Sequence, residues 1–312
     1  MNDIVEFIYD QFEAFDAEKA WSYIDDIAIA LSYGAGDLRL SSMYFLDYII
    51  CSEKIEDNFK EKYIVGLAER KNSYKFVENI SEIICSLDPV HQNKILALLD
   101  SAGLKEVSKT IGMVSAAKYK APAPISSSPQ NLTIIVHGTW ASSEAWWQKG
   151  GDFWKYIDSL VPNLYQGSSP FKWSGDNSHG KRKAAAKDLF NWLQGISEVN
   201  IIAHSHGGNI AMEATRMGLN IKKLILLGTP VRYEYAPIME NIEKLYCVYS
   251  KGDLIQKLGA KFSTRGDGRT MADSNKIINC YADDNGNHGK PNHSELHTPQ
   301  TWSHSENLAG IL

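Results

Sequence analysis

One serine of the sequence stands in a setting that suits nucleophilic chemistry. Ser205 lies in Ala203-His204-Ser205-His206-Gly207-Gly208, directly after the apolar run 199–203 and directly before a segment with helical periodicity. A sharp strand-to-helix turn lifts a serine hydroxyl out of a sheet, and it needs small residues two places before and two places after the serine. The pattern therefore predicts a nucleophile elbow, with Ala203 where such turns usually have glycine. The alternative is a glycine-rich turn with an idle serine.

A second short segment suits the stabilisation of an oxyanion. Val136-His137-Gly138-Thr139-Trp140 ends the β-branched apolar run 132–136. With a serine on a strand-to-helix turn, one oxyanion donor is a backbone N–H of the loop after such a strand, and the other belongs to the residue after the nucleophile. We therefore expect the main-chain N–H groups of Thr139 and His206 to form the oxyanion hole. A plain β-turn at His137-Gly138 is the alternative.

The serine needs a base, and the base needs an acid, in the chain order Ser, Asp, His. Asp253 follows the apolar run 245–249 on the turn Ser250-Lys251-Gly252-Asp253, which is where the acid belongs. We expect Asp253 to orient and stabilise the imidazole of the base. The same aspartate at the same place could instead be the N-cap of the next helix.

The base is expected in the loop that follows the last predicted strand. His293 begins His293-Ser294-Glu295-Leu296 at the end of that loop, just before a predicted helix, and is the preferred base, with His297 and His288 as alternatives. Clustered His and Asp side chains could also ligate a divalent metal. No spacing in Asp283-Asp284-Asn285-Gly286-Asn287 or its neighbours matches a known metal motif, so we predict no metal site.

The elements that must position these residues are read from the hydrophobic pattern. Continuous apolar runs that alternate with helical segments indicate a parallel sheet covered by helices on both faces. The predicted helices include 182–193 and 208–217. The predicted strands are Leu132–Val136, Val199–Ala203, Lys223–Leu227, Leu245–Tyr249 and Lys276–Tyr281.

The first part of the chain has a different pattern. From Ile4 to about Met113, apolar residues recur at three- and four-residue steps, which predicts six or seven helices. Asp88-Pro89 should open one of them, with Asp88 as N-cap. The Pro-, Ser- and Ala-rich stretch 116–130 reads as a linker. We therefore expect a helical domain over 1–115, a linker over 116–130 and an α/β catalytic domain over 131–312.

Composition limits the class of protein. The net charge is −5 and the pI is about 6.0, so nothing points to a nucleic-acid partner. Residues 1–120 hold 20 acidic and 13 basic side chains, which fits a basic protein partner for the helical domain and fits solvated helix faces equally well. The four cysteines share no motif spacing. Without a signal-peptide pattern or a long apolar stretch, we expect a soluble cytoplasmic protein, with signal-independent export left open.

The segment from about Leu132 to Leu312 resembles the α/β-hydrolase lipases and esterases. The resemblance is carried by His137-Gly138-Thr139-Trp140, Ala203-His204-Ser205-His206-Gly207-Gly208, Leu227-Gly228-Thr229-Pro230, Gly252-Asp253 and His293-Ser294. It covers under two-thirds of the chain and does not extend to the helical first part. It implies an α/β-hydrolase fold, preceded here by an all-α N-terminal domain, and ester hydrolysis through an acyl-enzyme without a cofactor.

The expected activity is that of a serine esterase or lipase, a phospholipase included, acting on a small-molecule or lipid ester through Ser205, His293 and Asp253. Tryptophans are numerous after the first predicted strand, and Trp140 and Trp173 are candidates for lining an acyl pocket, with simple packing as the alternative. A hypothesis from another class is an interaction or scaffold protein. In that case the acidic helical domain binds a partner and the hydrolase fold is inactive.

Overall fold

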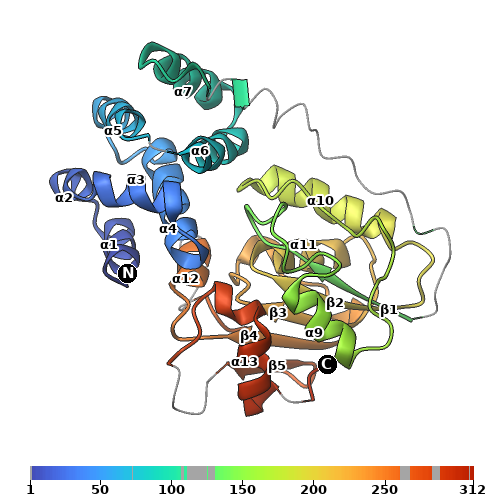
Figure 1. Ribbon diagram of the computed structural model, residues 1–312. Coiled ribbons are helices and arrows are strands. Elements are labelled where there is room, and N and C mark those ends of the chain that lie inside the picture. Colours follow the sequence, from blue (N-terminus) through green and yellow to red (C-terminus); the bar gives the residue numbers. More distant parts are fainter. Residues whose placement is uncertain are drawn as a thin grey trace. The chain divides into compact units, whose positions relative to one another are not determined.

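The computed structural model describes residues 2–71, 73–106, 109–110, 125, 131–260, 268–282, 289–308 and 310–312 (Figure 1). The chain divides into two compact units. Met1–Lys118 and Asp176–Ser178 form the first, and Tyr119–Gly175 and His179–Leu312 form the second. Apart from Ile125, the linker predicted over 116–130 lies outside the described residues.

The described residues of the first unit form helices and no strand. The helices are α1 (Asn2–Glu13), α2 (Ala17–Ser22), α3 (Ile24–Tyr33), α4 (Gly36–Cys51), α5 (Asp57–Glu69), α6 (Tyr74–Ser86) and α7 (Pro89–Ser101). Asp88 caps α7 as predicted, because its carboxylate accepts the backbone N–H groups of Val90 at 2.9 Å and His91 at 3.2 Å. Pro89 occupies the first turn, where its missing N–H costs nothing.

Helix α3 packs against α4, α5 and α6 and is central to the core of this unit. Its apolar face carries Ile24, Ile27 and Leu31, which are all buried. Arg39 is a buried charged side chain at the interface of α4 with α6, and polar partners compensate for its burial. Arg39 donates to Asn79 Oδ1 at 3.0 Å and to Glu82 Oε2 at 3.2 Å, so its charge is not left unpaired.

The second unit contains a five-stranded sheet in which every pair of neighbouring strands is parallel. Its strands follow one another in sequence order, β1-β2-β3-β4-β5. Four of the strands cover the apolar runs that predicted them, and the fifth begins one residue later than predicted, at Ile277. The strands are β1 (Asn131–Val136), β2 (Glu198–His204), β3 (Ile221–Leu227), β4 (Ile242–Tyr249) and β5 (Ile277–Tyr281).

The register brings the carboxyl ends of these strands to one edge. Val136 of β1 pairs with Ala203 of β2, and His204 of β2 pairs with Leu227 of β3. Leu227 in turn pairs with Val248 of β4. The loop after β1, Ser205, Gly228 and the turn that ends at Asp253 therefore leave the sheet along the same edge. This is the edge at which open parallel sheets bind their ligands.

Helices cover both faces of the sheet. Successive strand residues point to opposite faces, so Ile134 and Ile201 enter one apolar cluster, while Ile135 and Ile202 enter the other. The first cluster includes residues of α10 (His179–Trp192) and α11 (His206–Thr215), and the second includes residues of α9 (Asp152–Leu160) and α13 (Pro299–His304). The predicted α/β class with a parallel sheet is confirmed (Figure 1).

The remaining elements are short. They are α12 (Leu254–Ala260) and the 3₁₀ turns η1 (Tyr233–Tyr235), η2 (Met239–Asn241), η3 (Ser294–His297) and η4 (Glu306–Leu308). The helix predicted over 208–217 begins two residues earlier, at His206, because the chain enters the helix immediately after Ser205. Within the described part of the chain, no helix has both the length and the apolar character that a membrane crossing demands.

Candidate active site

Ser205 occupies the turn between β2 and α11 in a strained conformation. Its φ of 53° and ψ of −133° are unusual for any residue but glycine. Two backbone hydrogen bonds hold it there: its N–H donates to Leu227 O at 2.8 Å, and its carbonyl accepts the N–H of Gly208 at 3.0 Å. Ser205 thus has the strained backbone that a nucleophile elbow requires, and its hydrogen bond to β3 supports this conformation.

Small residues allow other segments to approach this turn. A Cβ added at Gly207 would lie 2.5 Å from His137 O, so a side chain there would collide with the end of β1. A Cβ added at Gly138 would lie 2.7 Å from the Cβ of Ser205. The loop after β1 thus passes directly beside the serine, where an oxyanion donor would have to be.

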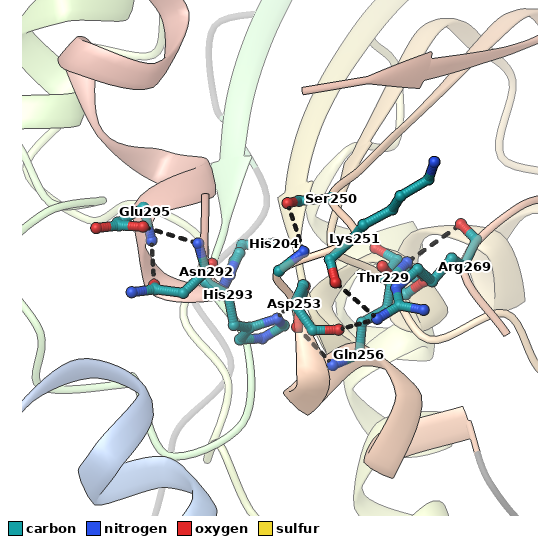
Figure 2. Close-up of polar contacts among 11 residues, drawn as sticks. His204, Thr229, Ser250, Lys251, Asp253, Gln256, Arg269, Asn292, His293 and Glu295 are labelled. Carbon is teal, nitrogen blue, oxygen red and sulfur yellow. Dashed lines mark hydrogen bonds and ion pairs between the residues drawn. The ribbon is translucent and has the colours of Figure 1, made fainter. Parts of the chain in front are cut away.

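Asp253 and His293 form a buried pair at the same edge (Figure 2). Nδ1 of His293 lies 2.7 Å from Oδ2 of Asp253, and the two side chains are 1% and 0% exposed. A carboxylate only accepts, so Nδ1 of His293 carries a proton and donates this hydrogen bond. The other oxygen, Oδ1, accepts the N–H of Gln256 at 2.7 Å in the first turn of α12. One carboxylate thus pairs with the imidazole and also caps the helix, so the two interpretations drawn from the sequence do not exclude each other. The role of Asp253 as a catalytic acid stays a prediction.

Gly228 makes room for that pair. It has a φ of +56°, and a Cβ added there would lie 2.7 Å from Oδ2 of Asp253 and 3.0 Å from Nδ1 of His293. Any side chain at this position would occupy the space of the hydrogen bond itself. The glycine that follows β3 is therefore a requirement of the site as well as of the turn.

The turn that carries Asp253 is fastened by polar side chains from other segments (Figure 2). The guanidinium of Arg269 donates through Nη2 to Asp253 O at 2.8 Å. Gln256 donates through Nε2 to Thr229 O at 2.8 Å, which joins α12 to the loop after β3. Gly252 N–H donates to Ser250 Oγ at 3.0 Å. These contacts fix the backbone from which the carboxylate projects.

The loop that carries His293 is shaped by a reciprocal cap. Asn292 N–H donates to Glu295 Oε2 at 2.7 Å, and Glu295 N–H donates to Asn292 Oδ1 at 3.0 Å. This is the exchange of a capping box, with Asn in place of Ser or Thr, and it starts the turn η3. Trp302 Nε1 donates to Leu296 O at 3.0 Å and anchors the far end of η3.

His137 organises the loop beside Ser205. Its ring lies near Trp147 and stacks on Trp173, and burial lowers its pKa to about 3, so it is neutral. Trp173 N–H donates to Nε2 of His137 at 3.4 Å, which leaves Nδ1–H to donate to Gly138 O at 2.9 Å. In a trans peptide the C=O and the next N–H point in opposite directions. Holding Gly138 O therefore turns the N–H of Thr139 away from the His137 ring.

The two expected oxyanion donors lie on either side of the elbow. Thr139 is in the loop beside Ser205, and His206 is the first residue of α11, where an N–H has no intrahelical acceptor. The His206 ring is occupied elsewhere, since its Nδ1 lies 2.7 Å from Asn209 Oδ1, and burial holds its pKa well below the usual range. For His206 the backbone N–H, and not the ring, is therefore the group that an oxyanion could contact. The side-chain Oγ1 of Thr139 is buried and has no hydrogen-bond partner in the described structure.

The tryptophans proposed for an acyl pocket are buried. Trp140 is 3% exposed, has a φ of 53°, and donates its N–H to Gly175 O at 2.8 Å. Trp173 is fully buried and donates through Nε1 to His137 O at 2.8 Å. Both residues thus stabilise the loop after β1 through buried contacts, which agrees with the packing role given as the alternative. A contact of either ring with substrate stays a prediction.

The other candidate bases are placed differently. His297 stacks on Trp146 with ring centroids 3.9 Å apart, and burial lowers its pKa to about 3. His304, on α13, bonds to Gln300 O at 2.8 Å. His288 lies outside the described residues, as do Asp283 and Asp284. Among the residues that are described, no group of three or more His, Cys, Asp or Glu side chains is arranged to hold a metal ion.

The structure thus joins Asp253 to His293 by a hydrogen bond and sets Ser205 on the same edge. The His293 ring lies 4.5 Å, between centroids, from that of His204, the residue before the serine.

Comparison with known proteins identifies no relative. No family model, no curated protein and no solved structure matches the chain.

Several residues that shape the site were not predicted from the sequence. The spacing Asn292-x-x-Glu295 is a capping-box signal and was detectable. The clearance supplied by Gly228 and the anchoring by Arg269 have no local signal, because each depends on a segment distant in sequence. The same holds for His204, whose ring contacts the loop of His293.

Gly228→Ala tests the clearance directly. The new methyl group would overlap Asp253 Oδ2, so we expect the His293–Asp253 hydrogen bond to break. The measurement is the low-field ¹H NMR signal of the His293 Nδ1 proton, which should be present in the wild type and lost in the variant. Gly218→Ala is the matched control, since Gly218 has a φ of +95° with no atom within 4 Å of the added Cβ. An intact signal in Gly228→Ala would contradict the assignment.

Proposed function

We propose that the second unit is a serine hydrolase of the α/β-hydrolase type that cleaves carboxylic esters through an acyl-enzyme. The observation that carries the proposal is the buried His293–Asp253 pair at the sheet edge where Ser205 sits on a strained strand-to-helix turn. Chain order supports it as well, because the serine follows β2, the aspartate follows β4 and the histidine follows β5. This is the order Ser, Asp, His of α/β-hydrolases.

The proposed mechanism moves one proton between Ser205, His293 and the leaving alcohol. Nε2 of His293, with its lone pair, takes the proton of Ser205 as Oγ bonds to the acyl carbon and the carbonyl π electrons move to oxygen. The resulting oxyanion is stabilised by the N–H groups of Thr139 and His206. His293 then returns the proton to the alcohol oxygen as the ester bond breaks. Water repeats the sequence on the acyl-enzyme and releases the acid, with Asp253 ionised throughout.

The substrate class is an ester of a small molecule or a lipid, which spans esterase, lipase and phospholipase activity. Fold and triad do not separate these activities. The rival function is an interaction protein with an inactive hydrolase fold, in which the acidic helical unit binds a partner.

The first experiment asks whether Ser205 reacts. A fluorophosphonate probe is expected to label the wild type and to spare Ser205→Ala, because the phosphonylated atom is Oγ of Ser205. p-Nitrophenyl esters of several chain lengths should be cleaved by the wild type alone. Equal labelling of both proteins would reject Ser205 as the nucleophile, and the absence of labelling and hydrolysis in a folded wild type would favour the interaction protein.

A second experiment separates the two tasks of Asp253. In Asp253→Asn, the amide oxygen can still accept the N–H of Gln256, so the cap of α12 is kept, but the side chain no longer holds His293 in the correct tautomer. We expect kcat on a p-nitrophenyl ester to fall by about four orders of magnitude. The melting temperature of Asp253→Asn should stay close to that of the wild type, because the cap of α12 is kept. Asp253→Ala, which loses both contacts, should in addition lower the melting temperature. Near-normal kcat in Asp253→Asn would exclude the triad.

A third experiment tests the loop after β1. His137→Phe keeps an aromatic ring against Trp147 and Trp173 but removes the donor to Gly138 O. The Thr139 N–H then loses its fixed orientation, and we expect kcat to fall by up to about 100-fold, the usual cost of one oxyanion donor. KM should change little, since the donor acts in the transition state. A variant with a raised KM and unchanged kcat would show that His137 serves ground-state binding instead.

A further inference from the structure

His204 is the last residue of β2 and directly precedes Ser205, yet its side chain contacts a segment 89 residues away. Nε2 of its ring lies 3.1 Å from the main-chain carbonyl oxygen of His293. A carbonyl only accepts, so Nε2 must carry the proton and donate. The strand that leads to the nucleophile therefore holds the backbone of the residue that supplies the base.

The His204 ring lies within a cluster of aromatic side chains. Ring centroids are 4.5 Å from His293, 4.6 Å from His297 and 5.5 Å from Trp146. His204 is 4% exposed, and burial, followed by the neighbouring His293, holds its pKa well below the usual range. It is therefore a neutral donor beside the base. A lysine or arginine donor would place a second positive charge next to His293 when that residue takes up a proton.

The other side of the ring is turned to the loop after β1. Nδ1 of His204 is buried and has no hydrogen-bond partner in the described structure. A Cβ added at Gly138 would lie 3.3 Å from that Nδ1. His204 thus touches the oxyanion loop on one side and the base loop on the other, and it is covalently joined to Ser205.

We propose that His204 is a positioning residue, whose Nε2–H bond to His293 O sets the distance of the catalytic base from the nucleophile. The expected effect on kcat rests on the proposed function, whereas the contact of His204 with His293 does not. The reciprocal cap of Asn292 and Glu295 shapes the base loop internally and does not tie it to β2. The His204 contact supplies that tie, so its loss should misplace the imidazole while Asp253 still holds Nδ1.

Two substitutions distinguish a hydrogen-bond donor from a ring that fills space. His204→Phe keeps the ring and removes the donor, whereas His204→Gln keeps an N–H donor of similar reach and removes the ring. Positioning predicts that the Phe variant loses kcat by about 10- to 100-fold, in keeping with the cost of a small misplacement. It also predicts an unchanged KM and clear recovery of kcat in the Gln variant. If packing were the role, the order would reverse, with Phe the more active, and the proposal would fail.

His297→Phe is the matched control. His297 lies in the same ring cluster and is partly exposed, and its Nδ1 has no hydrogen-bond partner in the described structure. Its kcat should stay near the wild-type value. A loss as large as that of His204→Phe would mean that the cluster acts only through packing.

A second readout needs no activity. Hydrogen–deuterium exchange over residues 289–297 should be faster in His204→Phe than in the wild type, and unchanged in His204→Gln and His297→Phe. If the wild type cleaves no ester, the proposed function fails while this measurement still tests the anchor. Equal exchange in the wild type and in His204→Phe overturns the positioning role whatever the activity.

Discussion

The hydrogen bond between His293 and Asp253 is the interaction on which the rest of this edge depends. A fully buried carboxylate is costly unless its oxygens are satisfied, and removing one partner of such a pair typically costs about 3–5 kcal/mol. Asp253 meets the requirement by accepting from His293 through one oxygen and from the first turn of α12 through the other. The same carboxylate therefore connects the turn after β4, the first turn of α12 and the loop after β5.

Neutral histidines hold the loops of this edge. His137, His204 and His297 all have a pKa lowered chiefly by burial, and the hydrogen bonds of the first two go to backbone carbonyls of the loops that form the site. A neutral imidazole can donate at one nitrogen without adding charge. The site thus gains donors that carry no charge. In the proposed mechanism, His293 is then the one ring of this group that takes up a proton.

The sequence was a good guide wherever one segment determines the structure. Continuous apolar runs identified the five strands, and the small residues around Ser205 indicated the elbow, because strand burial and tight turns depend on near neighbours. Asp253 and His293 were predicted from the order Ser, Asp, His along the chain and from their places after two strands, and the structure joins them by a hydrogen bond. The contacts of His204 with His293 O and of Arg269 with Asp253 O could not be read, since they join distant segments. From the sequence, the helix cap and the contact with the base were two alternatives for Asp253. The structure shows that its two carboxylate oxygens make the two contacts separately, which a sequence cannot reveal.

The sheet topology explains why Gly228 lies between Ser205 and Asp253. Ser205 follows β2 and Asp253 follows β4, so the two are separated by β3, and neighbouring strands are roughly 4.8 Å apart. An imidazole that is to reach both must lie over the end of β3. A Cβ at the first residue after β3 would approach Nδ1 of His293 to 3.0 Å, which leaves glycine as the residue that fits. In the proposed mechanism, the spacing of the strands thus determines where the imidazole of the base must lie. It also determines that the residue beneath it, Gly228, must lack a side chain.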